Sequence, residues 1–131
     1  MLERLNQLET NLNELEKVKE EYKIDDVKKD LRLQWIIRYG LFESIQIVID
    51  VSCHLVTKLN LSSPKSYYDC IKKLNNEKIL SNDLTEKLHR LIGLRNILVH
   101  EYVEIDIEKL FYYLENLDDF RKFVEEVKDI L

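Results

Sequence analysis

Apolar side chains recur at alternating three- and four-residue steps near the N-terminus, which is the spacing of one face of an α-helix. The stripe consists of Leu2, Leu5, Leu8, Leu12, Leu15, Val18 and Tyr22. Few residues interrupt a helical pattern elsewhere, because the 131 residues include only two glycines and one proline. The sequence therefore predicts an all-α protein, folded as one domain over residues 1–131.

Cap residues and breaks divide the rest of the chain into further predicted helices. The clearest break is Leu61-Ser62-Ser63-Pro64. The helices predicted after the first run from the Asp25-Asp26 pair to about Asn60, around residues 67–78, over residues 84–99 behind Ser81-Asn82-Asp83, and from Asp106 to the C-terminus. Short connections between them favour an up-and-down bundle of about five helices. The segment 99–107 is too short for us to predict a strand there.

The second predicted helix is apolar over much of its circumference between residues 35 and 56. Such a helix either lies at the centre of a fold or packs on a second subunit. Arg38, Glu43, Asp50 and His54 interrupt this stretch, so we expect a buried helix and not a membrane span.

Both glycines, Gly40 and Gly93, fall inside predicted helices. Glycine in a helix costs roughly 1 kcal/mol relative to alanine. We therefore expect a packing reason at each, such as two helix backbones that cross closely. The alternative is that each glycine arose by random sequence drift and is tolerated.

Cys53 and Cys70 are too few and too isolated for a disulfide framework or a cysteine-rich zinc site. We interpret them as separate buried or incidental thiols in a reducing cytoplasm. Met1 leads directly into a charged amphipathic segment, and so the sequence predicts no signal peptide.

Chemically versatile side chains cluster at the end of the fourth predicted helix, in the octapeptide Arg95-Asn96-Ile97-Leu98-Val99-His100-Glu101-Tyr102. Arginine can form two parallel hydrogen bonds with a phosphate group, and histidine can transfer protons near neutral pH. These groups suit phosphodiester chemistry. Each also has a structural interpretation: Arg95 as a surface ion-pair partner, His100 as a helix C-terminal residue, Asn96 as a cap, and Tyr102 as an anchor for the turn.

Arg95 and His100 would lie about 140° apart on an ideal helix, so they would not share a face. Asn96 and His100, four residues apart, would share one. Two arrangements would allow Arg95 and His100 to act together: the helix ends near Val99, or a second copy of the chain completes the site. We therefore predict a homodimer with two such motifs across a cleft.

The run Gly-Leu-Arg-Asn-Ile-Leu-Val-His-Glu-Tyr (residues 93–102), in a small helical chain and before the last helix, resembles the signature of HEPN domains, specifically of HepT-like toxins. The resemblance implies a metal-independent endoribonuclease that needs no cofactor. Arg95 and His100 would be catalytic, and the products would carry a 2′,3′-cyclic phosphate and a 5′-hydroxyl. Asn96 would orient His100 or bind a phosphate oxygen.

The same resemblance implies a toxin–antitoxin pair, whose antitoxin is an MntA-like nucleotidyltransferase that adenylylates Tyr102. AMP on Tyr102 would place bulk and negative charge beside the RNA site. The family often has glycine between the histidine and the tyrosine, where this chain has Glu101. The alternative is a non-catalytic HEPN subunit that binds substrate for a two-part nucleotidyltransferase.

A second polar stripe lies on the long predicted helix, where Glu43, Gln46, Asp50 and His54 recur at three- and four-residue steps. HEPN domains often carry a polar residue from this helix near the motif, and Glu43 is our candidate. A solvated stripe is the alternative. A metal site from Asp50, His54 and His89 matches no known ligand spacing, so we predict no metal.

The net charge of −5 argues against general coating of nucleic acid but leaves room for a local basic site. Basic residues gather at the motif helix and at the start of the second helix: Lys87, His89, Arg90, Arg95 and His100, and Lys28, Lys29 and Arg32. At the border of a dimer cleft they would form a phosphate track. The alternative is an ordinary mixed-charge surface.

Overall fold

The structure, a computed structural model, describes residues 1–100 and 104–131, and within them every regular element is helical. The elements are α1 (Leu2–Glu21), α2 (Ile24–Lys29), α3 (Leu31–Lys58), α4 (Tyr67–Asn76), α5 (Asn82–Leu98), α6 (Ile107–Tyr112), the 3-10 turn η1 (Tyr113–Asn116), α7 (Leu117–Val127) and the 3-10 turn η2 (Lys128–Ile130). The predicted all-α bundle is confirmed.

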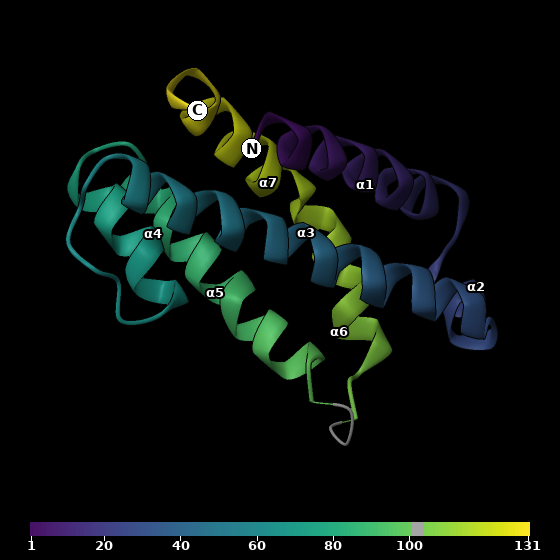
Figure 1. Cartoon of the computed structure of the whole chain (residues 1–131). Helices are drawn as coiled ribbons and strands as arrows, with labels where there is room; N and C mark the ends of the chain where they lie inside the picture. Colours follow the sequence, from purple (N-terminus) through teal and green to yellow (C-terminus); the bar gives the residue numbers. More distant parts are fainter. Residues whose placement is uncertain (101–103) are drawn as a thin grey trace.

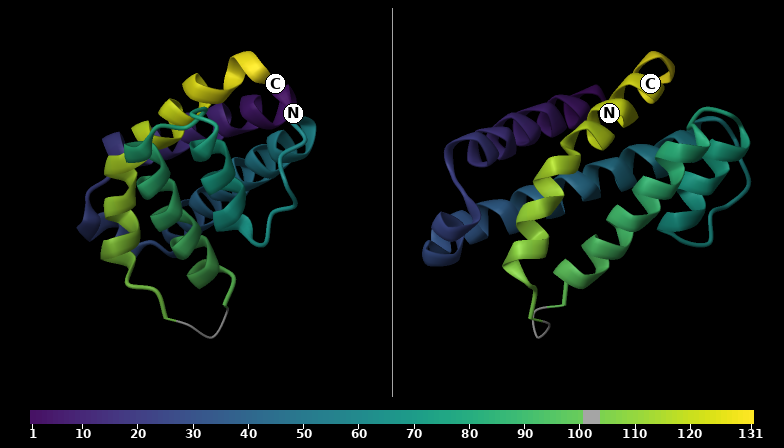
Figure 2. Two further views of the ribbon diagram at one scale, coloured as in Figure 1. Left: turned by 90° about the vertical axis from the view of Figure 1, so that its left-hand side faces the viewer. Right: turned by 180° about the vertical axis from the view of Figure 1, so that it is seen from behind.

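The long helix α3 runs through the middle of the bundle, with α1 along one flank and the α4–α5 pair along the other (Figure 1). Helix α7 packs against both α1 and α5, and the two chain ends lie close together in every view (Figure 2). Helices α5 and α6 approach each other at one end of the bundle, where the chain passes from residue 98 to residue 107 (Figure 1). The predicted motif lies at this end.

Two of the predicted helices are interrupted, and each interruption has a local cause. The second predicted helix is divided at Asp30, whose backbone is extended and whose carboxylate accepts the N–H groups of Arg32 and Leu33, which makes Asp30 the N-cap of α3. The Asp25-Asp26 pair lies inside α2 instead, behind the N-cap Lys23. The last predicted helix tightens into η1, which ends at Asn116. Asparagine has a low helix propensity, and the Asn116 backbone departs from helical angles, with φ −110° and ψ 22°.

Helix α3 is broadly apolar because it is central. Twelve of its residues are buried: Leu33, Ile37, Leu41, Ser44, Ile45, Ile47, Val48, Ile49, Val51, Ser52, Leu55 and Val56. It is long and apolar enough to cross a membrane, but 56% of its most apolar stretch is buried inside the protein, as expected of a core helix. Four large apolar side chains near its start remain exposed, namely Leu31, Trp35, Ile36 and Tyr39.

Gly40 lies where α1 crosses α3 closely. A Cβ atom added at Gly40 would lie 2.8 Å from Cδ2 of the buried Leu15, closer than van der Waals contact allows. The packing reason predicted for Gly40 is therefore confirmed. Among the described atoms, a Cβ atom added at Gly93 would meet only the hydroxyl oxygen of Tyr68, at 3.7 Å. No close crossing of helices therefore explains that glycine.

Replacing Gly40 with valine should lower the free energy of unfolding by about 2 kcal/mol, because the added methyl groups must displace Leu15 in a filled core. Gly93→Ala is the matched control, and it should raise that free energy by up to about 1 kcal/mol through helix propensity. Urea titration of both variants measures the difference. Equal destabilisation by the two substitutions would contradict the packing assigned to Gly40.

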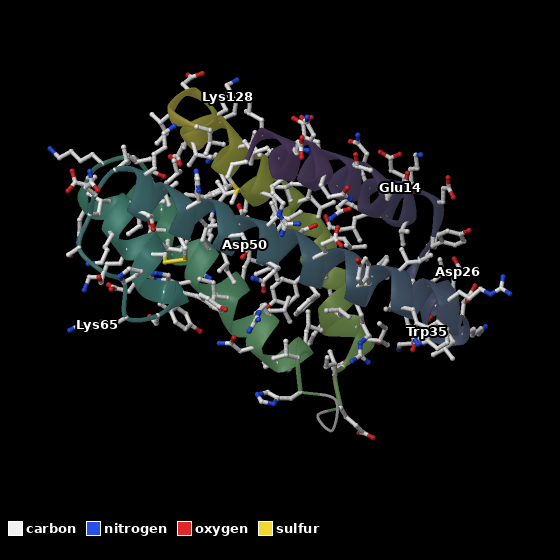
Figure 3. The ribbon with its side chains drawn as sticks, in the orientation of Figure 1. Glu14, Asp26, Trp35, Asp50, Lys65 and Lys128 are labelled. Carbon is white, nitrogen blue, oxygen red and sulfur yellow. A yellow bond between two sulfur atoms is a disulfide. The ribbon has the colours of Figure 1, made fainter. Side chains whose placement is uncertain are left out.

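The interpretation of the two cysteines as separate thiols is wrong. Cys53 on α3 and Cys70 on α4 form a disulfide, with Cα atoms 5.1 Å apart, drawn as the yellow bond beside α4 in Figure 3. The two residues lie on different helices and 17 positions apart. Only the packing of α4 on α3 brings them within bonding distance.

Candidate active site

Arg95 lies in the last turn of α5, with its guanidinium group between two aromatic rings. The guanidinium carbon is 5.7 Å from the ring centre of Phe42 on α3 and 5.3 Å from that of Tyr67 on α4. Both distances fall within the range of cation–π attraction. Three helices therefore fix the position of this half-buried cation.

Two hydrogen bonds orient the Arg95 guanidinium. Its Nε–H donates to Oε1 of Gln46 at 3.0 Å, and its Nη1 donates to Oδ1 of Asn96 at 3.2 Å. A guanidinium group carries five N–H donors. Three of the five therefore have no acceptor among the described residues, and they are available to the oxygens of a phosphate.

A series of polar contacts between side chains holds Gln46 in place. Nε2 of Gln46 donates to Oδ1 of Asp50 at 2.9 Å, which directs Oε1 of Gln46 toward Arg95. The other carboxylate oxygen of Asp50, labelled midway along α3 in Figure 3, forms an ion pair with Arg4 of α1 at 2.7 Å. Helices α1, α3 and α5 are thus connected through one polar network that ends at Arg95. Such support lowers the reorganisation needed to bind an anion.

His100 lies just beyond the end of α5 and is exposed. The helix ends at Leu98 with Val99 as its C-cap, and the backbone N–H of His100 donates to the carbonyl oxygen of Ile97 at 3.1 Å. Of the two arrangements considered for Arg95 and His100, the early helix end is therefore present. The 140° separation of an ideal helix no longer applies to this pair. Glu101 and Tyr102 lie outside the described residues.

Glu43 lies on the same stripe of α3 but contacts other residues. Its carboxylate accepts hydrogen bonds from the Tyr39 hydroxyl and from Nδ2 of Asn11 on α1. Both interactions, that of Tyr39 first, lower the pKa of Glu43 below its ordinary value. These hydrogen bonds stabilise the charged form of the carboxylate. The hydrogen bond from Arg95 to α3 goes to Gln46, three residues further along, so the supporting role predicted for Glu43 stays a prediction.

The residues considered for a metal site are not brought together. Asp50 pairs with Arg4, and His89 contacts the ring of Tyr68, with the ring centres 5.5 Å apart. Among the residues that the structure describes, no group of three or more His, Cys, Asp or Glu residues is arranged to hold a metal ion.

Carboxylates neutralise part of the predicted phosphate track. Lys28 pairs with Glu108, and Lys87 lies 3.2 Å from Asp83 and 3.7 Å from Asp119. Arg90 has no such partner in the described part of the chain, and with Lys87 and Lys109 it lines a cavity between α5, α6 and η1. Lys29, Arg32 and Arg95 also have no carboxylate partner among the described residues, so Lys28 and Lys87 are the members of the predicted track whose charge is paired there.

Sequence reasoning included Gln46 in the polar stripe but missed Phe42, Tyr67 and Arg4 as neighbours of the site. The three- and four-residue spacing shows that Phe42 and Gln46 share a face of α3. It does not show which residue of that face meets α5. Tyr67 and Arg4 come from other helices, and no local pattern connects them to Arg95.

The helical bundle, the oriented Arg95 and the exposed His100 five residues after it match the arrangement expected of a HEPN protein. Residues 8–127 match the family model described as Ribonuclease HepT-like. The chain belongs to this family, which confirms the family resemblance and the ribonuclease class predicted from the motif.

Relatives and solved structures agree with this assignment. The chain is 28% identical over 102 residues to an mRNA nuclease HepT of Shewanella oneidensis, covering 77% of each protein. It is 28% identical over 113 residues to a tRNA nuclease HepT of Aphanizomenon flos-aquae, covering 86% of this chain and 77% of the relative. The fold matches a tri-AMPylated HEPN toxin of Shewanella oneidensis, solved in complex with an MNT antitoxin, with a TM-score of 0.88 and 23% identity over 98% of this chain and 96% of that one.

Proposed function

We propose that this protein is the toxin of a toxin–antitoxin pair and cleaves RNA without a metal ion, using Arg95 and His100. The observation that carries the proposal is the position of Arg95. Its guanidinium group is held by two rings and two hydrogen bonds, keeps three N–H donors available, and precedes an exposed histidine by five residues. The named nuclease activities of the relatives support the same reaction class.

The reaction is an internal transfer of the phosphoryl group. The ribose 2′-oxygen forms a bond to phosphorus while the bond from phosphorus to the 5′-oxygen breaks. His100 acts as the base that accepts the 2′-hydroxyl proton or as the acid that protonates the leaving 5′-oxygen. Arg95 stabilises the negative charge on the non-bridging oxygens in the transition state. The products carry a 2′,3′-cyclic phosphate and a 5′-hydroxyl, and no water is consumed in this step.

Neutralisation by an antitoxin is the second part of the proposal. A cognate MntA-like nucleotidyltransferase would transfer AMP from ATP to the hydroxyl oxygen of Tyr102, two residues beyond His100, and the β- and γ-phosphates would leave as pyrophosphate. The AMPylated toxin found with its antitoxin among the similar structures supports this assignment. The added phosphate would repel the RNA backbone and compete for Arg95.

A homodimer completes the proposal. The exposed patch of Leu31, Trp35, Ile36 and Tyr39 at the start of α3 offers an apolar surface for a second copy. A dimer would supply two histidines to one cleft, one for each proton transfer. Sedimentation equilibrium of wild type and Trp35→Glu tests this: a dimer that the substitution dissociates is expected, and a monomeric wild type would contradict it.

The decisive experiment combines RNA cleavage with intact mass. Protein expressed alone should cut RNA in the presence of EDTA, leave cyclic phosphate ends, and arrest growth unless His100 is replaced by alanine. Protein coexpressed with the neighbouring nucleotidyltransferase should gain one or more AMP masses, which Tyr102→Phe removes. Unchanged mass, copurification of the two proteins and no RNA cleavage would favour the non-catalytic binding subunit, to which the net charge of −5 is also suited.

A further inference from the structure

A cavity of about 430 Å³ opens beside Arg95, between the start of α4, the loop before it, α3 and α5. This volume lies within the range of roughly 300–1,000 Å³ typical of small-ligand sites. Lys65, labelled at the edge of the molecule in Figure 3, belongs to the loop on one side of the cavity. Asn96, the neighbour of Arg95 in the motif, lines the other side.

Two consecutive tyrosines form the aromatic wall of this cavity. Tyr67 and Tyr68 line it and remain 43% and 39% exposed, so their rings are accessible to a ligand. Tyr68 packs against the His89 ring in a T-shaped contact, and Tyr67 lies against the Arg95 guanidinium. Exposed aromatic rings fixed in this way are the surfaces on which proteins stack unpaired bases.

The floor and the far end of the cavity have different chemistry. The Cys53–Cys70 disulfide and the buried Ile92 provide an apolar floor that suits the face of a flat ring. Asn96 provides a side-chain amide, whose Oδ1 accepts from Arg95 and whose Nδ2 has no acceptor among the described residues. A carboxamide can read the hydrogen-bonding edge of a base.

We propose that this cavity binds one unpaired base of the RNA substrate, stacked on Tyr68 with its edge against Asn96. The inference rests on the proposed function and specifies its substrate as single-stranded RNA. Because Asn96 contacts both the cavity and Arg95, a base in the cavity positions an adjacent phosphate at the guanidinium group. The cavity therefore selects which phosphodiester is cut.

Binding of short oligoribonucleotides to His100→Ala protein, which leaves the RNA intact, tests the proposal by fluorescence anisotropy. An abasic residue moved along the oligonucleotide should weaken binding most at a single position, by roughly ten- to a hundredfold. Tyr68→Ala should weaken binding by a similar factor, and the abasic residue should then cost nothing more. Tyr68→Phe, which keeps the ring, should bind as the parent does.

Tyr22→Ala is the matched control, because Tyr22 is similarly exposed but lies at the end of α1, away from the cavity. Circular dichroism checks that each variant is folded. If the His100→Ala protein bound every abasic oligonucleotide with equal affinity, the inference would be overturned, even if Tyr68→Ala failed to fold. If wild type cuts RNA and Tyr68→Ala cuts the same bonds equally well, the cavity inference fails while the proposed function stands. If wild type neither binds nor cuts RNA, both fail.

Discussion

Replacing Arg95 with alanine is expected to lower the rate of RNA cleavage by about a hundred- to a thousandfold. The substitution removes the cation whose three available N–H groups would contact the phosphate in the transition state. Arg95→Lys should restore little activity, because an ammonium group lacks the planar pair of donors that binds two phosphate oxygens. Single-turnover cleavage of a labelled RNA measures the chemical step directly.

Arg121→Ala is a suitable control for the loss of an arginine. Its guanidinium group is also held by two side chains, Asp118 and Glu16, but on the α7 side of the molecule. Gln46→Leu tests the positioning network separately, because it leaves Arg95 in place and removes its acceptor on α3. A cleavage rate in Arg95→Ala within threefold of the rate in Arg121→Ala would contradict the assigned role of Arg95.

Reduction of the Cys53–Cys70 disulfide should lower the free energy of unfolding by about 3 kcal/mol, the value expected for a closed loop of this length. The bond connects residues 17 positions apart and spans the loop between α3 and α4. Reduction therefore increases the conformational freedom of the unfolded chain. Urea titration with and without dithiothreitol measures the effect.

The double variant Cys53→Ala with Cys70→Ala provides the control, since reductant should then change nothing. Thiol alkylation of the unfolded, unreduced protein is an independent check. Two reactive thiols per chain would show that the bond does not form, and they would restore the interpretation of the cysteines as separate thiols.

Local features of the sequence were sufficient for most of the helices. Ser81 and Asp106 cap α5 and α6 as predicted, because their side chains accept the backbone N–H groups that a helix start leaves unpaired. The division at Asp30 was missed, although aspartate is a strong N-cap residue. The apolar pattern continues across Asp30, and the pattern alone does not show where the backbone becomes extended.

The sequence by itself determined the helical class, the stripes that form the core, and the motif containing Arg95, Asn96 and His100. These are properties of residue types and of spacing along one helix. Only the tertiary structure decided that Gln46 contacts Arg95, that Cys53 meets Cys70, and that Tyr67 and Tyr68 border a cavity beside the motif. Each of these contacts joins residues of different helices. Its partners depend on the rotation and the crossing of packed helices, which many side chains fix together and no local pattern records.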